Sequence, residues 1–102
     1  MSGTAPVDDV GKVFASGDAY RQARHCLEII AQAFKELGCG QEAVAGTRMF
    51  VTDVARGEEF GRRHGELFSE HPPATSMVEV RSVIHKDMLI EIEADAVDYK
   101  AD

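Results

Sequence analysis

Three carboxylates recur at every second position near the end of the chain, at Glu91, Glu93 and Asp95. Apolar residues alternate with them over 90–96. In an extended strand this period places all three carboxylates on one face. Carboxylates that close repel one another unless something neutralises them. Two interpretations follow: a solvated sheet face, as is usual for Asp and Glu, or one wall of a cleft shared with another subunit.

Arg48 is a second candidate for chemistry. It lies inside the β-branched and aromatic run 47–52, where a charged residue is unexpected. A planar guanidinium binds a carboxylate through two parallel hydrogen bonds, so Arg48 is a candidate anion anchor. The alternative, which the usual behaviour of arginine favours, is an exposed side chain or one paired with carboxylates of the chain itself.

The residues that most often bind metals show no pattern typical of a metal site. These are His25, His64, His71, His85, Cys26 and Cys39. None of their spacings matches a zinc site, so no metal is predicted. We interpret the histidines as surface or helix-face residues. The cysteines are interpreted as buried small side chains or loosely exposed thiols.

Length and charge narrow the class of protein. The 102 residues predict one domain, residues 1–102, and 44% hydrophobic residues suffice for a packed core. A net charge of −7 argues against nucleic acid as the main ligand, because such binding rests on many Lys and Arg contacts to phosphates. No stretch has the length of a membrane span, and the N-terminus lacks the order of a signal peptide. We therefore expect a cytoplasmic protein that does not bind membranes.

Two helices are predicted to position these residues. Asp18 is a suitable N-cap for a long amphipathic helix that ends at Gly38, a residue suited to a left-handed C-terminal position. A second helix is expected over about 57–69 and is ended by Pro72-Pro73. Phe60, His64, Leu67 and Phe68 share one face of it.

Three strands complete the prediction, over 47–52, 76–83 and 89–97, and the last two are expected to form a hairpin. The order helix, strand, helix, strand, strand predicts an α+β two-layer sandwich, with two helices on one face of a small mixed sheet. The face with Glu91, Glu93 and Asp95 is then left open.

Four segments, in order and over most of the chain, resemble the RidA (YjgF) family of reactive-intermediate deaminases, long described as endoribonuclease L-PSP. They are Gly17-Asp18-Ala19-Tyr20, Arg48-Met49-Phe50-Val51-Thr52-Asp53, Pro73-Ala74-Thr75-Ser76-Met77-Val78-Glu79-Val80 and Ile90-Glu91-Ile92-Glu93-Ala94. The resemblance implies a chorismate-mutase-like subunit, a homotrimer, and small-molecule clefts between neighbouring subunits. It implies no cofactor.

The resemblance further implies that these clefts hydrolyse an enamine or imine to a carbonyl compound and ammonia. The family's water-positioning glutamate falls on Glu91, with Glu93 as the rival if the register differs. The arginine that follows Pro-Ala and grips a carboxylate is replaced by Thr75, so the chain looks like a member of an arginine-less subgroup. We interpret Thr75 as a pocket-lining hydroxyl, since no His or Lys stands beside it in sequence to activate it. Met77 takes the place of a frequent cysteine.

The N-terminus also departs from the family. Residues 1–6 look like the end of the second strand of the family's first hairpin. The chain is thus expected to lack the earlier part of that hairpin. Gly3, in this segment, is expected to line the cleft.

Three functions are considered on these grounds. The first is hydrolysis of a reactive imine or enamine, with Glu91 handling water and Thr75, Met77, Arg48 and Gly3 binding substrate. The second is a non-catalytic trimer that binds a small metabolite or acts as a regulatory or chaperone-like partner, which the missing arginine favours. Ribonuclease activity ranks last because of the net charge of −7.

Overall fold

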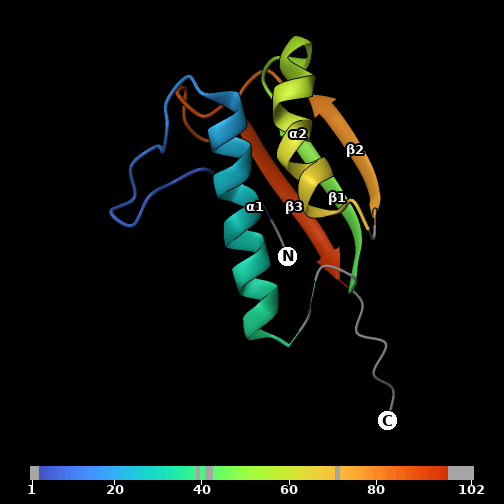
Figure 1. Cartoon of the computed structure of the whole chain (residues 1–102). Coiled ribbons are helices and arrows are strands. Elements are labelled where there is room, and N and C mark those ends of the chain that lie inside the picture. Colours follow the sequence, from blue (N-terminus) through green and yellow to red (C-terminus); the bar gives the residue numbers. More distant parts are fainter. Residues whose placement is uncertain (1–2, 39, 41–42, 71, 97–102) are drawn as a thin grey trace.

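The computed structural model describes residues 3–38, 40, 43–70 and 72–96. Its elements follow the predicted order (Figure 1). They are α1 (Ala19–Glu36), β1 (Val44–Val51), a short 3-10 turn (Val54–Arg56), α2 (Gly57–Leu67), β2 (Ala74–Glu79) and β3 (Ile90–Ala96). The predicted α+β class, with two helices against a mixed sheet, is confirmed.

Both predicted ends of α1 are confirmed. The side chain of Asp18 accepts a hydrogen bond of 3.0 Å from the backbone N–H of Arg21, which satisfies a donor that has no partner within the helix. Gly38 has a φ of 84°, which glycine adopts without steric cost. Between them, the apolar face is buried; it includes Ala23, Cys26, Leu27, Ile30 and Phe34.

The sheet has the strand order β2-β1-β3, with β2 parallel and β3 antiparallel to β1. The predicted hairpin between the last two strands is therefore wrong, since β1 lies between them. Val80 N–H donates to Val51 O and Thr52 N–H donates to Leu89 O, so the 80–89 connection runs around the end of β1. Parallel pairing of β1 with β2 is possible because α2 makes the crossover between them.

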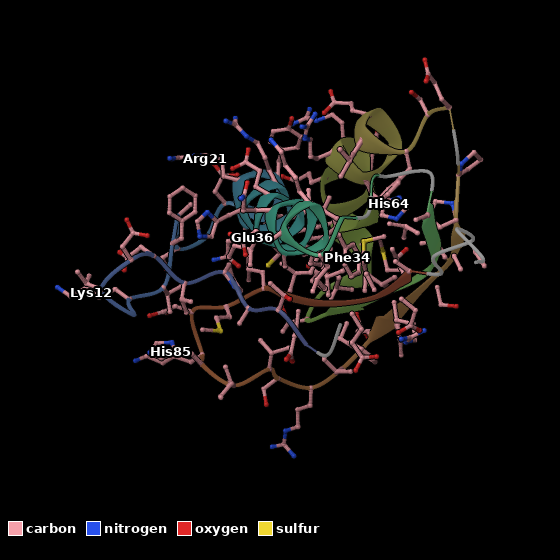
Figure 2. The ribbon with its side chains drawn as sticks, turned by 90° about the horizontal axis from the view of Figure 1, so that it is seen from below. Lys12, Arg21, Phe34, Glu36, His64 and His85 are labelled. Carbon is pink, nitrogen blue, oxygen red and sulfur yellow. The ribbon has the colours of Figure 1, made fainter. Side chains whose placement is uncertain are left out.

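The two faces of this sheet differ. Both helices lie against one face, and Figure 1 shows α1 over β3 and α2 beside it. That face contributes the core of the domain, which includes Met49, Val51, Ile90, Ile92 and Ala94, all at most 3% exposed. In Figure 2, Phe34 and His64 lie among the helices and the sheet, whereas Lys12 and His85 lie at the periphery. The described helices include none long and apolar enough to cross a membrane.

Gln22 fixes the loop before β3. Its side chain is fully buried on α1, donating to Asp87 O at 3.0 Å and accepting from Leu89 N–H at 2.7 Å. A buried amide with both ends satisfied stabilises one loop conformation. The N-terminal segment is held in a similar way, because Thr4 exchanges two backbone hydrogen bonds with Ile92, of 2.8 and 3.0 Å. It thus extends the sheet beyond β3.

Candidate functional site

Glu91 and Gly3 are brought together by the pairing of Thr4 with Ile92. A Cβ on Gly3 would overlap Oε1 of Glu91 and would lie 2.9 Å from its Cδ. Only glycine therefore leaves room for this carboxylate in its position. Glu91 is half-buried on the open face of β3, opposite Phe50 of β1.

Arg48 bonds the other two carboxylates of that face. Its Nε donates to Glu93 at 2.8 Å and its Nη2 donates to Asp95 at 2.9 Å. The hydrogen bond from Arg48 lowers the pKa of Asp95 below its ordinary value. This is the carboxylate-paired alternative considered for Arg48. Among the described residues, Glu91 is the member of the acidic triplet with no such partner.

Thr75 lies on the opposite face, in a cluster that the sequence did not reveal. Thr47 and Thr75 are partners in the parallel register of β1 and β2, and their Oγ1 atoms are 2.9 Å apart. Nε2 of His64, on α2, is 2.8 Å from Thr47 Oγ1 and 3.4 Å from Thr75 Oγ1. Thr75 also donates to Pro73 O at 3.2 Å. The tertiary structure thus brings His64 close to Thr75, although no histidine stands beside Thr75 in the sequence.

This threonine–histidine cluster, Thr47, His64 and Thr75, is graded in exposure. Thr47 is 1% and His64 8% exposed, whereas Thr75 is exposed on the edge strand β2. Burial lowers the pKa of His64, so the imidazole is neutral at neutral pH. The ring packs against Phe68, with centroids 4.7 Å apart. The cluster therefore leads from a buried neutral imidazole to a surface hydroxyl.

Met77 follows Thr75 on the same face and packs against the core. Its Sδ would lie 3.2 Å from a Cβ on Gly57, at the start of α2. The predicted residues thus fall into two groups. Thr75 and Met77 are on the helix-covered face, and Arg48 is on the open face with Gly3 and Glu91. Within one chain, the sheet separates the two groups.

A separate apolar cavity of about 510 Å³ lies between the last turns of the two helices and the start of β1. Its described lining includes Ile30, Phe34, Val44, Leu67 and Phe68, and contains no residue predicted for the site. Cys26 is buried, and burial raises the pKa of its thiol to about 12, which rules out a thiolate nucleophile at neutral pH. Cys39 and His71 lie outside the described residues.

Comparisons with known proteins agree with this fold. The profile of the family described as endoribonuclease L-PSP matches residues 1–98. The 3-aminoacrylate deaminase RutC of Acinetobacter baylyi is 33% identical over 96 residues, which cover 94% of this chain and 75% of that protein.

Two solved structures are similar at comparable identity. A YjgF-family protein of Mycobacterium tuberculosis is 38% identical with a TM-score of 0.82, covering 94% of this chain and 75% of the other. The YjgF gene product of E. coli is 35% identical with a TM-score of 0.83, and the coverage is 95% and 77%.

The fold is that of YjgF-type proteins, with two helices on one face of a mixed sheet. This chain belongs to the RidA (YjgF) family, described as endoribonuclease L-PSP.

Proposed function

We propose that this protein hydrolyses a small reactive enamine or imine to a carbonyl compound and ammonia. Family membership supports this, together with the similarity to a relative named as a deaminase of 3-aminoacrylate. The observation that carries the proposal is Glu91. Among the described residues it is the carboxylate of the open face without a cation or donor bound to it, and in this position it occupies the space that a Cβ on Gly3 would take.

The reaction places one demand on Glu91. A carboxylate accepts a proton from water as the water oxygen attacks the C=N carbon, and the nitrogen takes up a proton to give a carbinolamine. The C–N bond then breaks, ammonia leaves with a further proton, and the hydroxyl loses its proton to give C=O. One imine and one water thus give one carbonyl compound and one ammonia. Glu93 is less suited to this role, because its carboxylate already accepts a charge-assisted hydrogen bond from Arg48.

A complete site in this proposal requires more than one chain. Glu91 and Thr75 are on opposite faces of one sheet, so they share a cleft only when the open face of one subunit meets the edge of another. We therefore propose a homotrimer with the cleft between neighbours. Half of the Val78 side chain is exposed on the open face, at 47%, next to half-buried Phe50. Apolar area of this kind favours contact with a second copy.

The test is turnover of a small uncharged imine, generated in the cuvette from a primary amine by a flavin-dependent amine oxidase and followed as loss of the imine. Glu91→Gln keeps the shape and removes the base, and we expect the rate to fall by about 10²-fold or more. Glu93→Gln is the matched control on the same face and keeps most of the rate. Light scattering on each variant is expected to give a mass near three subunits. Unchanged turnover in Glu91→Gln trimers would exclude Glu91 as the base.

Thr75 favours a second candidate function, in which the cleft binds a metabolite without turnover. A neutral hydroxyl in place of an arginine removes a strong anchor for a charged substrate. The same cuvette assay separates the two functions when thermal unfolding is measured alongside it. A metabolite that raises the Tm without being consumed would favour binding alone.

A further inference from the structure

The threonine–histidine cluster restricts which hydrogen bonds Thr75 offers to a ligand. A hydroxyl has one proton to donate and two lone pairs to accept with. Neutral imidazole Nε2 makes one hydrogen bond, and the shorter of its two contacts is the 2.8 Å contact to Thr47. At 3.4 Å the contact to Thr75 is the weaker one. Thr75 Oγ1 is therefore bonded chiefly to Thr47 and to Pro73 O.

Both tautomers of His64 lead to the same result. If Nε2 carries the proton, it donates to Thr47, Thr47 donates to Thr75, and the Thr75 proton goes to Pro73 O. If Nε2 is bare, Thr47 donates to it, and the Thr75 proton goes to Thr47 or to Pro73 O. In each arrangement the proton of Thr75 already has an acceptor within the chain. At least one lone pair of its oxygen remains open.

Among residues 3–38, 40, 43–70 and 72–96, no cationic side chain is bonded to this cluster. The charged neighbours on α2, Arg63 and Glu66, lie on its side toward Tyr20 and Glu28 of α1. Arg48 of β1 is on the other face of the sheet. On β2, Glu79 accepts from Val54 N–H at the far end of the strand. An excess of seven negative charges over the chain adds to the cost of bringing an anion here.

We infer that Thr75 is held as a hydrogen-bond acceptor, so that the cleft selects an uncharged, N–H-bearing substrate, such as an amide or an enamine amino group, over a carboxylate. This deepens the proposed function and rests on it, because it places Thr75 in the same cleft as Glu91. Thr75 is the residue that determines specificity, and Thr47 and His64 are positioning residues that help hold its proton on an acceptor within the chain.

The test is a binding titration that follows no reaction. Acetamide and acetate have almost the same size and differ in charge and in N–H groups. Each is titrated at constant ionic strength into protein labelled with ¹³C at the threonine methyls and the histidine rings. We expect acetamide to shift the Thr75 methyl and the His64 ring saturably, in the millimolar range, and acetate to shift neither at the same concentrations.

Four variants complete the test, with the His64 ring signal as a common reporter. Thr75→Val removes the oxygen at constant volume and should weaken acetamide binding about threefold to tenfold. Thr75→Ser should restore the binding, and Thr75→Arg should reverse the preference toward acetate. Thr52→Val, just beyond the other end of β1, is the matched control and should bind acetamide like the parent protein.

Three results would overturn the inference: tighter binding of acetate than of acetamide, equal acetamide affinity in Thr75→Val, or no saturable shift with acetamide. A failure of the proposed function appears elsewhere, as unchanged turnover in Glu91→Gln. The titration consumes no substrate, so either result stands without the other.

Discussion

The open face and the helix-covered face of the sheet satisfy their polar groups by different means. On the open face, Arg48 binds Glu93 and Asp95 through charge-assisted bonds between side chains that are 34–59% exposed. On the covered face, Thr47, His64 and Thr75 form uncharged hydrogen bonds that begin at a buried residue. Water screens the first group and is excluded from most of the second. Stability should thus depend strongly on the covered face and weakly on the ion pairs.

Truncating a large side chain is expected to give the largest difference between the two faces in the loss of unfolding free energy. Phe60 of α2 is fully buried, and Phe60→Ala leaves a cavity that costs about 3–5 kcal/mol of unfolding free energy. Val78→Ala on the open face is the matched truncation and should cost about 0.5 kcal/mol in an isolated subunit. Urea unfolding measures both. Equal losses would mean that the open face is itself buried in solution, as in a trimer.

Breaking the covered cluster is expected to have the next largest effect. Thr47→Val keeps the volume but leaves Nε2 of His64 without its 2.8 Å partner, which costs about 1–3 kcal/mol. Thermal unfolding is the measurement, and Thr52→Val is the control. A change no larger than that of the control would show that Thr75 or water replaces the lost hydroxyl.

The two faces should also lose stability in different pH windows. His64 has a pKa below its ordinary value of 6.5, so between these two values the unfolded chain binds more protons than the folded one. Its contribution is complete above about pH 6.5 and is lost as the pH falls from there through the folded pKa. Asp95 also has a lowered pKa, and its contribution is lost only as the pH falls below its ordinary value of 3.8.

When the unfolding free energy is measured from pH 8 downward, we expect the parent protein to lose stability below about pH 6.5. His64→Gln should not show this loss, which we call the higher window. Asp95→Asn is the control and should keep that window. A higher window that persists in His64→Gln would assign it to another group.

The ion pairs of the open face are expected to contribute least. Replacing Arg48 with Met removes both pairs but keeps most of the aliphatic side chain. We expect the smallest loss of unfolding free energy among these variants, further reduced in high salt, because both pairs are exposed and screened by water. Urea unfolding at low and high salt checks this, with Arg24→Met, which loses an exposed pair to Glu28 on α1, as the control. A loss of several kcal/mol would indicate that the pairs are buried in an assembly.

Much of the local structure was readable from residue types. The cap at Asp18, the left-handed Gly38 and the alternation over 90–96 depend on neighbours within a few positions, so their physical causes are in the sequence itself. The four segments that resemble the RidA (YjgF) family occur in the family's order along the chain. The predicted hairpin between the last two strands is wrong. Alternation along a strand shows which side chains share a face, but it says nothing about which edge of β1 each later strand joins.

The same distinction between local sequence pattern and tertiary contact applies to the candidate site. The sequence alone determined that Glu91, Glu93 and Asp95 share a face, because the two-residue period of a strand fixes the direction of its side chains. Only the tertiary structure decided that Arg48 binds two of those carboxylates and leaves Glu91, and that His64 and Thr47 stand behind Thr75. Those contacts join residues 11–47 positions apart. The Arg48 contacts arise from the antiparallel register of β1 with β3, and the contacts of Thr75 arise from the parallel register of β1 with β2 and from the packing of α2. No local pattern encodes such a register, because it is set by the burial of whole faces at once.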